Sequence, residues 1–172
     1  MNALFESHPP PSRSIRHTRT GTSRILYAED EPAIRRFSTL ALTHSGYAVT
    51  AVEDGEQAWD ALHAEPFDLL ITDNDMPRLT GVELVTKARL GGIDLPVIVA
   101  SGSVGLFTGG DLGWLRLATM LQKPFTTDDL LDSVQRVLRA AASVTGRREV
   151  FSPAFAEAAA WIEPMQHWGI NE

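Results

Sequence analysis

The sequence predicts an α/β protein built on a doubly wound, five-stranded parallel sheet. Five short apolar runs alternate with segments of helical periodicity, which is the pattern of parallel strands joined by crossover helices. Several runs end on acids, a hydroxyl or a lysine, as strands do when they bring polar groups to one edge of a sheet. The chain has 172 residues, of which 44% are hydrophobic and 22% charged. This length and composition suit one globular domain with tails.

The first half of the chain predicts strands at 24–28 and 47–52, each followed by a helix. Pro32 favours the first turn of a helix, which is expected to end at Ser45-Gly46. Its apolar residues recur at helical spacing: Ile34, Phe37, Leu40 and Ala41. Asp54-Gly55 turns the second strand into another helix, whose inward residues are expected to be Ala58, Ala61 and Leu62.

The second half predicts strands at 68–72, 97–100 and 119–122. The strand at 68–72 leads through a loop to Gly81 and to a helix at about 82–90, which Gly91-Gly92 ends. A polar run at 126–129 caps the last helix. The apolar face of that helix is formed by Leu130, Leu131, Val134, Val137 and Leu138. This alternation has the flavodoxin-like strand order as its commonest form.

The segment 103–118 stands where a fourth helix is expected. Its glycines are Gly105, Gly109, Gly110 and Gly113, and each glycine costs about 1 kcal/mol in a helix interior. The helix is therefore predicted to be short, displaced or mobile. Its apolar residues either cover the sheet or fold onto a partner or a second copy of the chain: Leu106, Phe107, Trp114 and Leu117.

Both ends of the chain are predicted to lie outside the domain, which spans residues 24–142. Residues 1–23 contain Pro9-Pro10-Pro11 and little apolar surface, so we expect a disordered N-terminal tail. Residues 143–172 are expected to be a linker and a C-terminal helical extension. Ser152-Pro153 favours a helix start. The alanine-rich helix that follows is about ten residues long and needs a surface to pack on.

The charge and composition argue against several classes of protein. The formal net charge is −7, so the chain has no general attraction to nucleic acid and no direct DNA binding is expected. It has no cysteine, which excludes disulfides and thiolate metal sites. No run of about 18 apolar residues occurs, so no membrane span is expected.

Acids follow two of the predicted strands. Asp73 directly follows the strand at 68–72, and Glu29 and Asp30 directly follow the strand at 24–28. Because open parallel sheets bind ligands at the carboxyl ends of their strands, these carboxylates are expected to lie together. They repel one another unless a cation joins them, and Mg²⁺ takes oxygen ligands from both carboxylates and phosphates. The pattern predicts a Mg²⁺ and phosphoryl site. The alternative, for a lone aspartate at a strand end, is a turn former.

Ser101 and Lys123 end the strands at 97–100 and 119–122. A hydroxyl donor and a compact cation both suit phosphate oxygens. Taken singly, Ser101 reads as a turn residue and Lys123 as a solvated lysine. Together with the acids they supply a nucleophile, metal ligands, a hydroxyl and a counter-charge, each at the end of its own strand.

Four motifs occur in one order along the chain: Glu29-Asp30-Glu31-Pro32, Asp73 with Met76-Pro77 and Gly81, Ser101-Gly102, and Lys123-Pro124-Phe125. In order and spacing they resemble the receiver domain of two-component response regulators, over about residues 24–142. The resemblance implies that Asp73 accepts a phosphoryl group from phosphohistidine. It also implies a Mg²⁺ ion held by Glu29, Asp30, Asp73 and the backbone carbonyl of Asp75. Lys123 is then expected to pair with Asp73 before transfer and with a phosphoryl oxygen after it, while Ser101 hydrogen bonds another oxygen.

The resemblance also implies how the signal leaves the domain. Ser101 is expected to move inward on phosphorylation, and the small Gly102 leaves room for the phosphoryl donor. Where family members often carry an aromatic residue, three places before the lysine, this chain has Met120, whose flexible side chain can fill the same space. The carboxylate of Asp75 either orients or repels attacking water or simply points to solvent.

The implied partners are a sensor histidine kinase or a histidine phosphotransfer protein, and the implied location is the cytoplasm. A homodimer is a further option. No output domain is recognisable, so we expect a stand-alone phosphorelay switch that is not an enzyme beyond its own phosphorylation and dephosphorylation. One alternative is a receiver-like interaction module that works without phosphorylation. Another is a flavodoxin-like ligand-binding protein or small hydrolase, which the lack of a glycine-rich phosphate loop after the first strand disfavours.

Overall fold

A computed structural model of the chain describes residues 21–102 and 115–145. The strands within these residues are β1 Arg24–Ala28, β2 Ala48–Val52, β3 Leu69–Asp73, β4 Val97–Ser101 and β5 Thr119–Gln122. The helices are α1 Pro32–His44, α2 Gly55–Ala64, α3 Gly81–Leu90 and α5 Thr127–Thr145. Residues 1–20 of the predicted tail, most of the predicted fourth helix and the predicted C-terminal helix lie outside the described residues.

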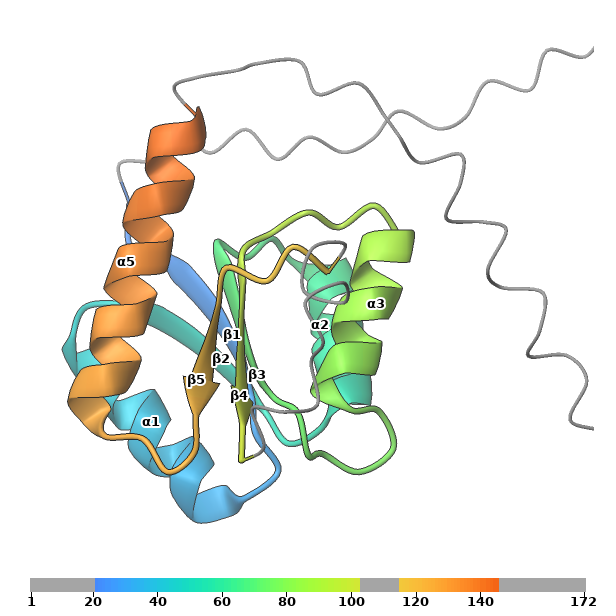
Figure 1. Ribbon diagram of the computed structural model, residues 1–172, viewed down its shortest axis with the longest axis horizontal. Helices are drawn as coiled ribbons and strands as arrows, with labels where there is room; N and C mark the ends of the chain where they lie inside the picture. The colour runs from blue at the N-terminus through green and yellow to red at the C-terminus, as the bar shows by residue number, and fades with distance from the viewer. Residues whose placement is uncertain (1–20, 103–114, 146–172) are drawn as a thin grey trace, which may run out of the picture.

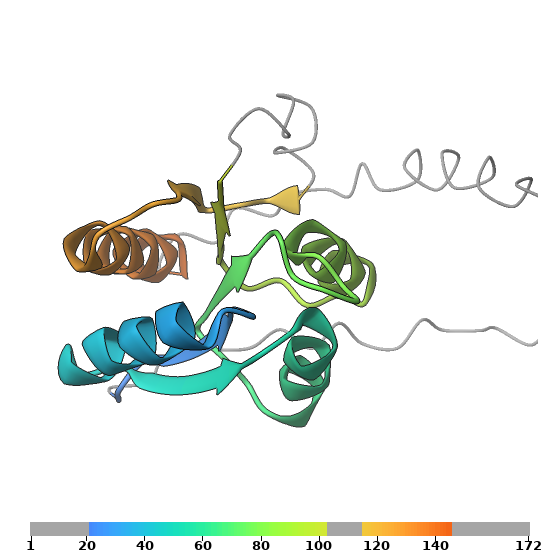
Figure 2. The same cartoon turned by 90° about the horizontal axis from the view of Figure 1, so that it is seen from below.

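The five strands form one parallel sheet in the order β2-β1-β3-β4-β5. Helices α1 and α5 cover one face of this sheet, and α2 and α3 cover the other (Figures 1 and 2). The predicted doubly wound, flavodoxin-like fold is therefore confirmed. Because all five strands run in the same direction, their carboxyl ends meet at one edge of the sheet. None of the helices in the described ranges is long and apolar enough to cross a membrane.

The core consists of two apolar layers, one on each face of the sheet. Strand residues that face α1 and α5 include Ile25, Leu69, Ile71, Ile98 and Ala100. Those that face α2 and α3 include Leu26, Ala28, Leu70, Val97 and Val99. Strands buried on both faces need apolar side chains at every position, which explains the continuous apolar runs of β1, β3 and β4. In the segment before β5, Leu117 packs against the layer on the α2 and α3 side.

Helix α1 does not bury all the apolar residues that recur at helical spacing, since Ile34 and Ala41 are only half-buried. The buried side chains are Ser38 and Leu42, whereas Phe37 is 66% and Leu40 52% exposed. Ser38 lies beside the buried Tyr27 of β1 and hydrogen bonds with its hydroxyl. The large strand residue fills the space under the helix, so the helix turns a small polar residue toward it.

Two helices differ slightly from their predicted bounds. Thr80 and Glu83 form a reciprocal capping box, which satisfies the first free N–H groups and starts α3 at Gly81, one residue earlier than predicted. Helix α5 continues to Thr145 and so includes the first residues of the predicted linker. Within it, the Ser143 hydroxyl donates to the carbonyl of Arg139 at 3.0 Å.

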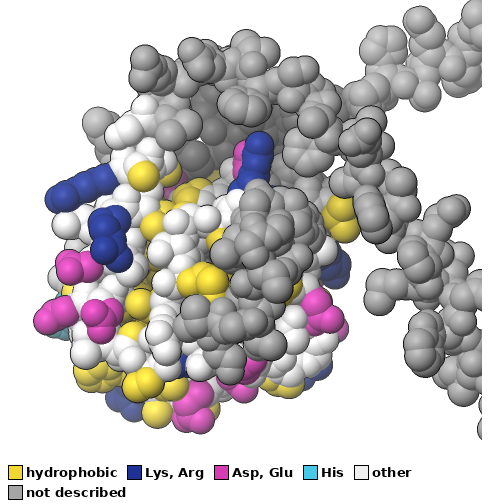
Figure 3. Space-filling model, viewed as in Figure 1, with side chains coloured by type: hydrophobic (Ala, Val, Ile, Leu, Met, Phe, Trp, Pro, Cys, Tyr) yellow, Lys and Arg dark blue, Asp and Glu magenta, His cyan; other side chains and the backbone are white. Residues whose placement is uncertain are grey.

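Acidic and basic side chains are separated along α5. Acids occupy its first turns and arginines follow farther along: Asp128, Asp129 and Asp132, then Arg136 and Arg139. Figure 3 shows this separation of acidic and basic side chains along the side of the molecule where α5 lies. The acids in the first turn stabilise the helix through its dipole, whereas the arginines lie before the last turn.

Candidate functional site

The carboxyl ends of β1 and β3 bring the three predicted acids together. Glu29, Asp30 and Asp73 each offer a carboxylate oxygen, and these oxygens all lie within 4.8 Å of one another. The two strands are neighbours, with Ala28 opposite Thr72, so Glu29 and Asp73 leave the sheet side by side. Both are buried, with exposures of 1% and 3%. A cluster of hard oxygen donors such as this one fits a divalent cation of the Mg²⁺ class.

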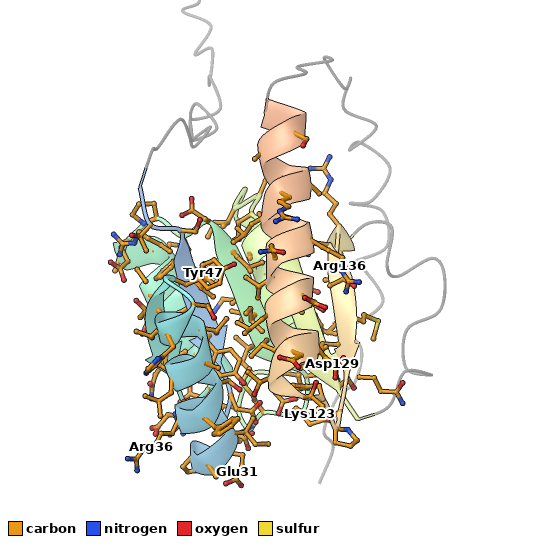
Figure 4. The ribbon with its side chains drawn as sticks, turned by 90° about the vertical axis from the view of Figure 1, so that its left-hand side faces the viewer. Glu31, Arg36, Tyr47, Lys123, Asp129 and Arg136 are labelled. Carbon is orange, nitrogen blue, oxygen red and sulfur yellow. The ribbon has the colours of Figure 1, made fainter. Side chains whose placement is uncertain are left out.

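Lys123 supplies a positive charge to this cluster. Its Nζ donates to Asp73 Oδ2 at 2.6 Å and to Glu29 Oε1 and Oε2 at 3.1 and 3.0 Å. Figure 4 shows Lys123 at the end of the molecule where α1 and α5 begin, as marked by Glu31 and Asp129. Burial alone would lower the pKa of the Lys123 amine, but the hydrogen bonds to the two carboxylates outweigh it and the pKa is raised. Burial raises the pKa of Glu29, although Lys123 opposes this.

Ser101 stands at the end of β4, next to the strand that delivers Lys123. Its side chain is buried, and its carbonyl accepts from the backbone N–H of Lys123 at 2.9 Å. A Cβ added at Gly102 would meet no atom of residues 21–102 or 115–145 within 4 Å. Met120 is half-buried and pairs with Val99 in the sheet register.

The loop after Asp73 is tied closely to that residue. The backbone N–H of Asp75 donates to Asp73 Oδ1 at 3.1 Å, while the Asp75 side chain is exposed. Gly81, at the far end of the loop, returns to the same point, because a Cβ there would lie 2.4 Å from the carbonyl oxygen of Asp73. The absence of a side chain at Gly81 lets the loop close over the backbone of Asp73.

Comparison with known proteins assigns the family. The family model described as the response regulator receiver domain matches residues 25–135. This chain belongs to that family. The receiver is 39% identical over 118 residues to the response regulator receiver protein CpdR of Brucella abortus, covering 69% of this chain and 98% of that one. It is 36% identical over 123 residues to response regulator MprA of Mycobacterium avium, covering 67% of this chain and 51% of MprA. The receiver thus spans about half the length of that relative.

A solved relative of the receiver was captured with a metal. The response regulator TrrA from Thermotoga maritima, in complex with Mg²⁺-BeF, is 27% identical and superposes with a TM-score of 0.61. The match covers 67% of this chain and 99% of TrrA. The family assignment confirms the resemblance read from the four motifs, and it identifies the chain as a phosphorylatable switch of two-component signalling.

Two contacts in the receiver site were not predicted from the sequence. Arg35 of α1 donates through Nη1 to the carbonyls of Glu29 and Asp30, at 2.6 and 3.0 Å. The hydroxyl of Tyr27 donates to Glu29 Oε2 at 3.5 Å. Strand alternation could have revealed the second contact, because Tyr27 is two residues before Glu29 and shares its side of β1. The Arg35 contact has no such signal, since it depends on how α1 lies on the sheet.

A buried acid outside the cluster holds the receiver loop that carries Asp75. Asp54 is 1% exposed, accepts from the backbone N–H of Gln57 at 2.8 Å and forms an ion pair with Arg78. Burial alone would raise the pKa of Asp54, but the hydrogen bonds from Gln57 and Arg78 outweigh it, so the pKa is lowered.

Replacing Asp54 with asparagine is expected to make receiver stability less dependent on pH. The folded state holds the Asp54 proton more weakly than the unfolded state, so this carboxylate stabilises the fold above its ordinary pKa of 3.8. That contribution is lost as the pH falls through the lower, folded value. The parent should therefore have a higher free energy of unfolding than Asp54→Asn at pH 7, and this difference should decrease below about pH 4. Chemical unfolding at several pH values measures it.

Glu56→Gln is the control for the Asp54 variant. Glu56 also lies near Arg78, with 3.6 Å between Oε2 and Nε, but its side chain is 65% exposed. Exposed ion pairs contribute little, so its unfolding curve should follow the parent at every pH. A difference in free energy of unfolding between the parent and Asp54→Asn that stays constant until acid unfolds the protein would contradict the prediction.

Proposed function

We propose that Asp73 accepts a phosphoryl group from a phosphohistidine of a sensor histidine kinase or histidine phosphotransfer protein, in the presence of Mg²⁺. One observation supports this most strongly: Lys123 Nζ lies 2.6 Å from Asp73 Oδ2, inside a cluster of three carboxylates. The Lys123 ammonium places a counter-charge directly beside the Asp73 carboxylate, which is the nucleophile.

In the proposed reaction, a carboxylate oxygen of Asp73 forms a bond to phosphorus while the bond from phosphorus to the histidine nitrogen breaks. The electron pair of that bond stays on the imidazole, which leaves and takes a proton. Glu29, Asp30, Asp73 and the backbone carbonyl of Asp75 would hold Mg²⁺, whose charge offsets the repulsion between nucleophile and phosphoryl oxygens. Lys123 then pairs with a phosphoryl oxygen instead of Asp73.

The proposed output begins at Ser101. Its hydroxyl turns toward a phosphoryl oxygen, and because its carbonyl is bonded to the N–H of Lys123, the ends of β4 and β5 respond together. Met120 lies on the edge strand, opposite Val99, and repacks as the usual aromatic residue would. The small Gly102 keeps the approach of the donor open. The phosphoryl group favours whichever arrangement binds it better, and the signal passes by protein contact or onward phosphotransfer.

Receiver domains pair with sensor histidine kinases and are generally switches rather than enzymes. We infer that this receiver catalyses only its own phosphorylation and dephosphorylation, acts in the cytoplasm, and can form a homodimer. Its net charge of −7 argues against direct DNA binding, and no membrane contact is proposed. The full set of acids, hydroxyl and lysine disfavours an interaction module that works without phosphorylation.

Intact mass measurement tests the proposal. The chain is incubated with acetyl phosphate or phosphoramidate, with Mg²⁺ or with a chelator. We expect a Mg²⁺-dependent gain of one phosphoryl group, about 80 Da, that is absent in Asp73→Asn. The matched control is Asp75→Asn, which changes an exposed acid of the same loop but keeps its backbone carbonyl, and which should still gain the group. A gain in Asp73→Asn, or none in the parent with either donor, would contradict the proposal.

A further inference from the structure

The loop between β3 and α3 carries Asp75, and its two ends are fixed by main-chain hydrogen bonds. At the start, the N–H of Asn74 donates to the carbonyl of Ala100 in β4 at 2.8 Å. At the end, the N–H of Gly81 donates back to the carbonyl of Asn74 at 3.3 Å. Between these bonds, the N–H of Asp75 donates to Asp73 Oδ1 at 3.1 Å. The part of the loop that needs a further hold is therefore the backbone beyond Asp75.

Arg78 supplies a hold in the middle of this loop. Its φ is +68°, in the left-handed region that residues other than glycine, asparagine and aspartate rarely adopt. A residue persists there when its surroundings impose the conformation. The side chain of Arg78 reaches out of the loop to the buried carboxylate of Asp54, with which its Nη2 forms a hydrogen-bonded ion pair.

Asp54 is itself fixed by contacts that do not involve the loop. It is the N-cap of α2, and both the backbone N–H and the side-chain amide of Gln57 donate to it, at 2.8 and 3.1 Å. The next residue, Gly55, touches the loop directly, because a Cβ there would lie 2.3 Å from the carbonyl oxygen of Leu79. The start of α2 is therefore a rigid support against which the loop rests.

We infer that the Arg78–Asp54 pair is a positioning device for the metal site: it holds the loop so that the backbone carbonyl of Asp75 faces the Mg²⁺ position. Arg78 and Asp54 act through the loop rather than by contact with the ion. The inference rests on the proposed function, which makes the Asp75 carbonyl a ligand. It adds the start of α2 to the parts of the receiver that determine metal affinity.

Because Arg78 and Asp54 carry opposite charges, their removal distinguishes a positioning role from a purely electrostatic effect on Mg²⁺ binding. If Arg78 and Asp54 acted on Mg²⁺ only through their charge, removing the cation would strengthen Mg²⁺ binding and removing the anion would weaken it. A positioning role predicts weaker binding in both cases, because either change releases the middle of the loop. It also predicts that the double variant binds no more weakly than the single ones, since both remove the same contact.

The experiment titrates the full-length chain with Mg²⁺ alone and follows binding by the shifts of its backbone amide NMR signals. The variants are Arg78→Gly, Asp54→Ser and the double variant. Glycine tolerates the left-handed backbone, and serine keeps an acceptor at the N-cap, so both variants are expected to stay folded although the ion pair is lost. Each variant is expected to bind Mg²⁺ about tenfold more weakly, the lower range for residues that orient a metal ligand.

Arg116→Gly is the matched control. Arg116 also has a positive φ, +50°, and also pairs with an aspartate, Asp94, at 2.9 Å. It precedes β5, at the opposite edge of the sheet from the acids. The change removes the same charge and releases the same kind of backbone, so it should leave the Mg²⁺ affinity within about twofold of the parent.

The outcomes are distinct. Weaker binding in both single variants, with an unchanged control, supports the inference. Tighter binding in Arg78→Gly would mean that the charge acts through its field, and parent-like affinity in all variants would mean that the loop needs no support; either result overturns the inference while leaving the proposed function in place. A parent chain that binds no Mg²⁺ would overturn the metal site, and the inference with it.

Discussion

Replacing Lys123 with methionine is expected to lower the free energy of unfolding by about 3 kcal/mol at neutral pH without Mg²⁺. The variant keeps most of the side-chain volume but removes the charge that lies 2.6 Å from Asp73 and 3.0 Å from Glu29. Both carboxylates are buried, so the loss leaves two like charges facing each other in a region of low dielectric. This loss lies at the lower end of the range for removing one partner of a buried ion pair, because 20% of the Lys123 side chain is exposed. Urea unfolding monitored by circular dichroism measures it.

Lys87→Met controls for the loss of a lysine as such. Lys87 is exposed on α3 and lies over the ring of Trp59, so its removal should cost only about 0.5 kcal/mol. Added Mg²⁺ should narrow the difference in stability between Lys123→Met and the parent. Without the lysine cation the carboxylates of the variant should bind Mg²⁺ more tightly, so the ion stabilises the variant more than the parent. Equal stabilities of Lys123→Met and the parent in chelator would show that the two carboxylates need no counter-charge.

Gly81→Ala is expected to destabilise the receiver by about 2 kcal/mol, the middle of the range for overpacking a well-filled site. The new Cβ would lie 2.4 Å from the Asp73 carbonyl oxygen and 3.1 Å from the Cα of Asn74. Both contacts are with backbone, so no side chain can rotate away. The backbone of Asp73 has to shift, and the gain of phosphoryl mass should fall with it. Chemical unfolding and the intact mass experiment measure the two effects.

Gly102→Ala makes the same chemical change at a position where a Cβ meets no atom of the described residues within 4 Å. Its stability should stay within about 0.5 kcal/mol of the parent. If Gly81→Ala were as stable as Gly102→Ala and gained phosphoryl mass at the parental rate, the close approach of Gly81 to Asp73 would matter neither for stability nor for phosphorylation.

The fold and the acid cluster were predictable because both follow from local patterns. Strands buried on two faces give unbroken apolar runs, and polar residues at the ends of parallel strands must meet at one edge of the sheet. The contact of Asp73 with Lys123 was expected from the resemblance to the receiver family rather than from spacing. The fold and the acid cluster depend on periodicity and on chain direction, which a sequence displays directly.

Contacts that depend on how elements lie against one another were not predictable. The spacing of the apolar residues in α1 did not identify the residues that the helix buries, because Ser38, and not Phe37, lies beside Tyr27. The ion pair of Arg78 with Asp54 joins residues 24 positions apart in two different loops. No spacing rule links such residues. The pair arises from the packing of the loop after β3 on the start of α2.

The distance along the chain between the charges of the site has a consequence for synthesis. Lys123 lies 94 residues after Glu29 and 50 after Asp73, and it follows the last strand to be made. A growing chain therefore presents all three acids before the cation that balances them has left the ribosome. The strand β5, which closes the edge of the sheet, is therefore also the strand that brings the balancing cation to the acids. The charge balance of the site is available before α5 has covered its face of the sheet, since α5 follows β5 in the chain.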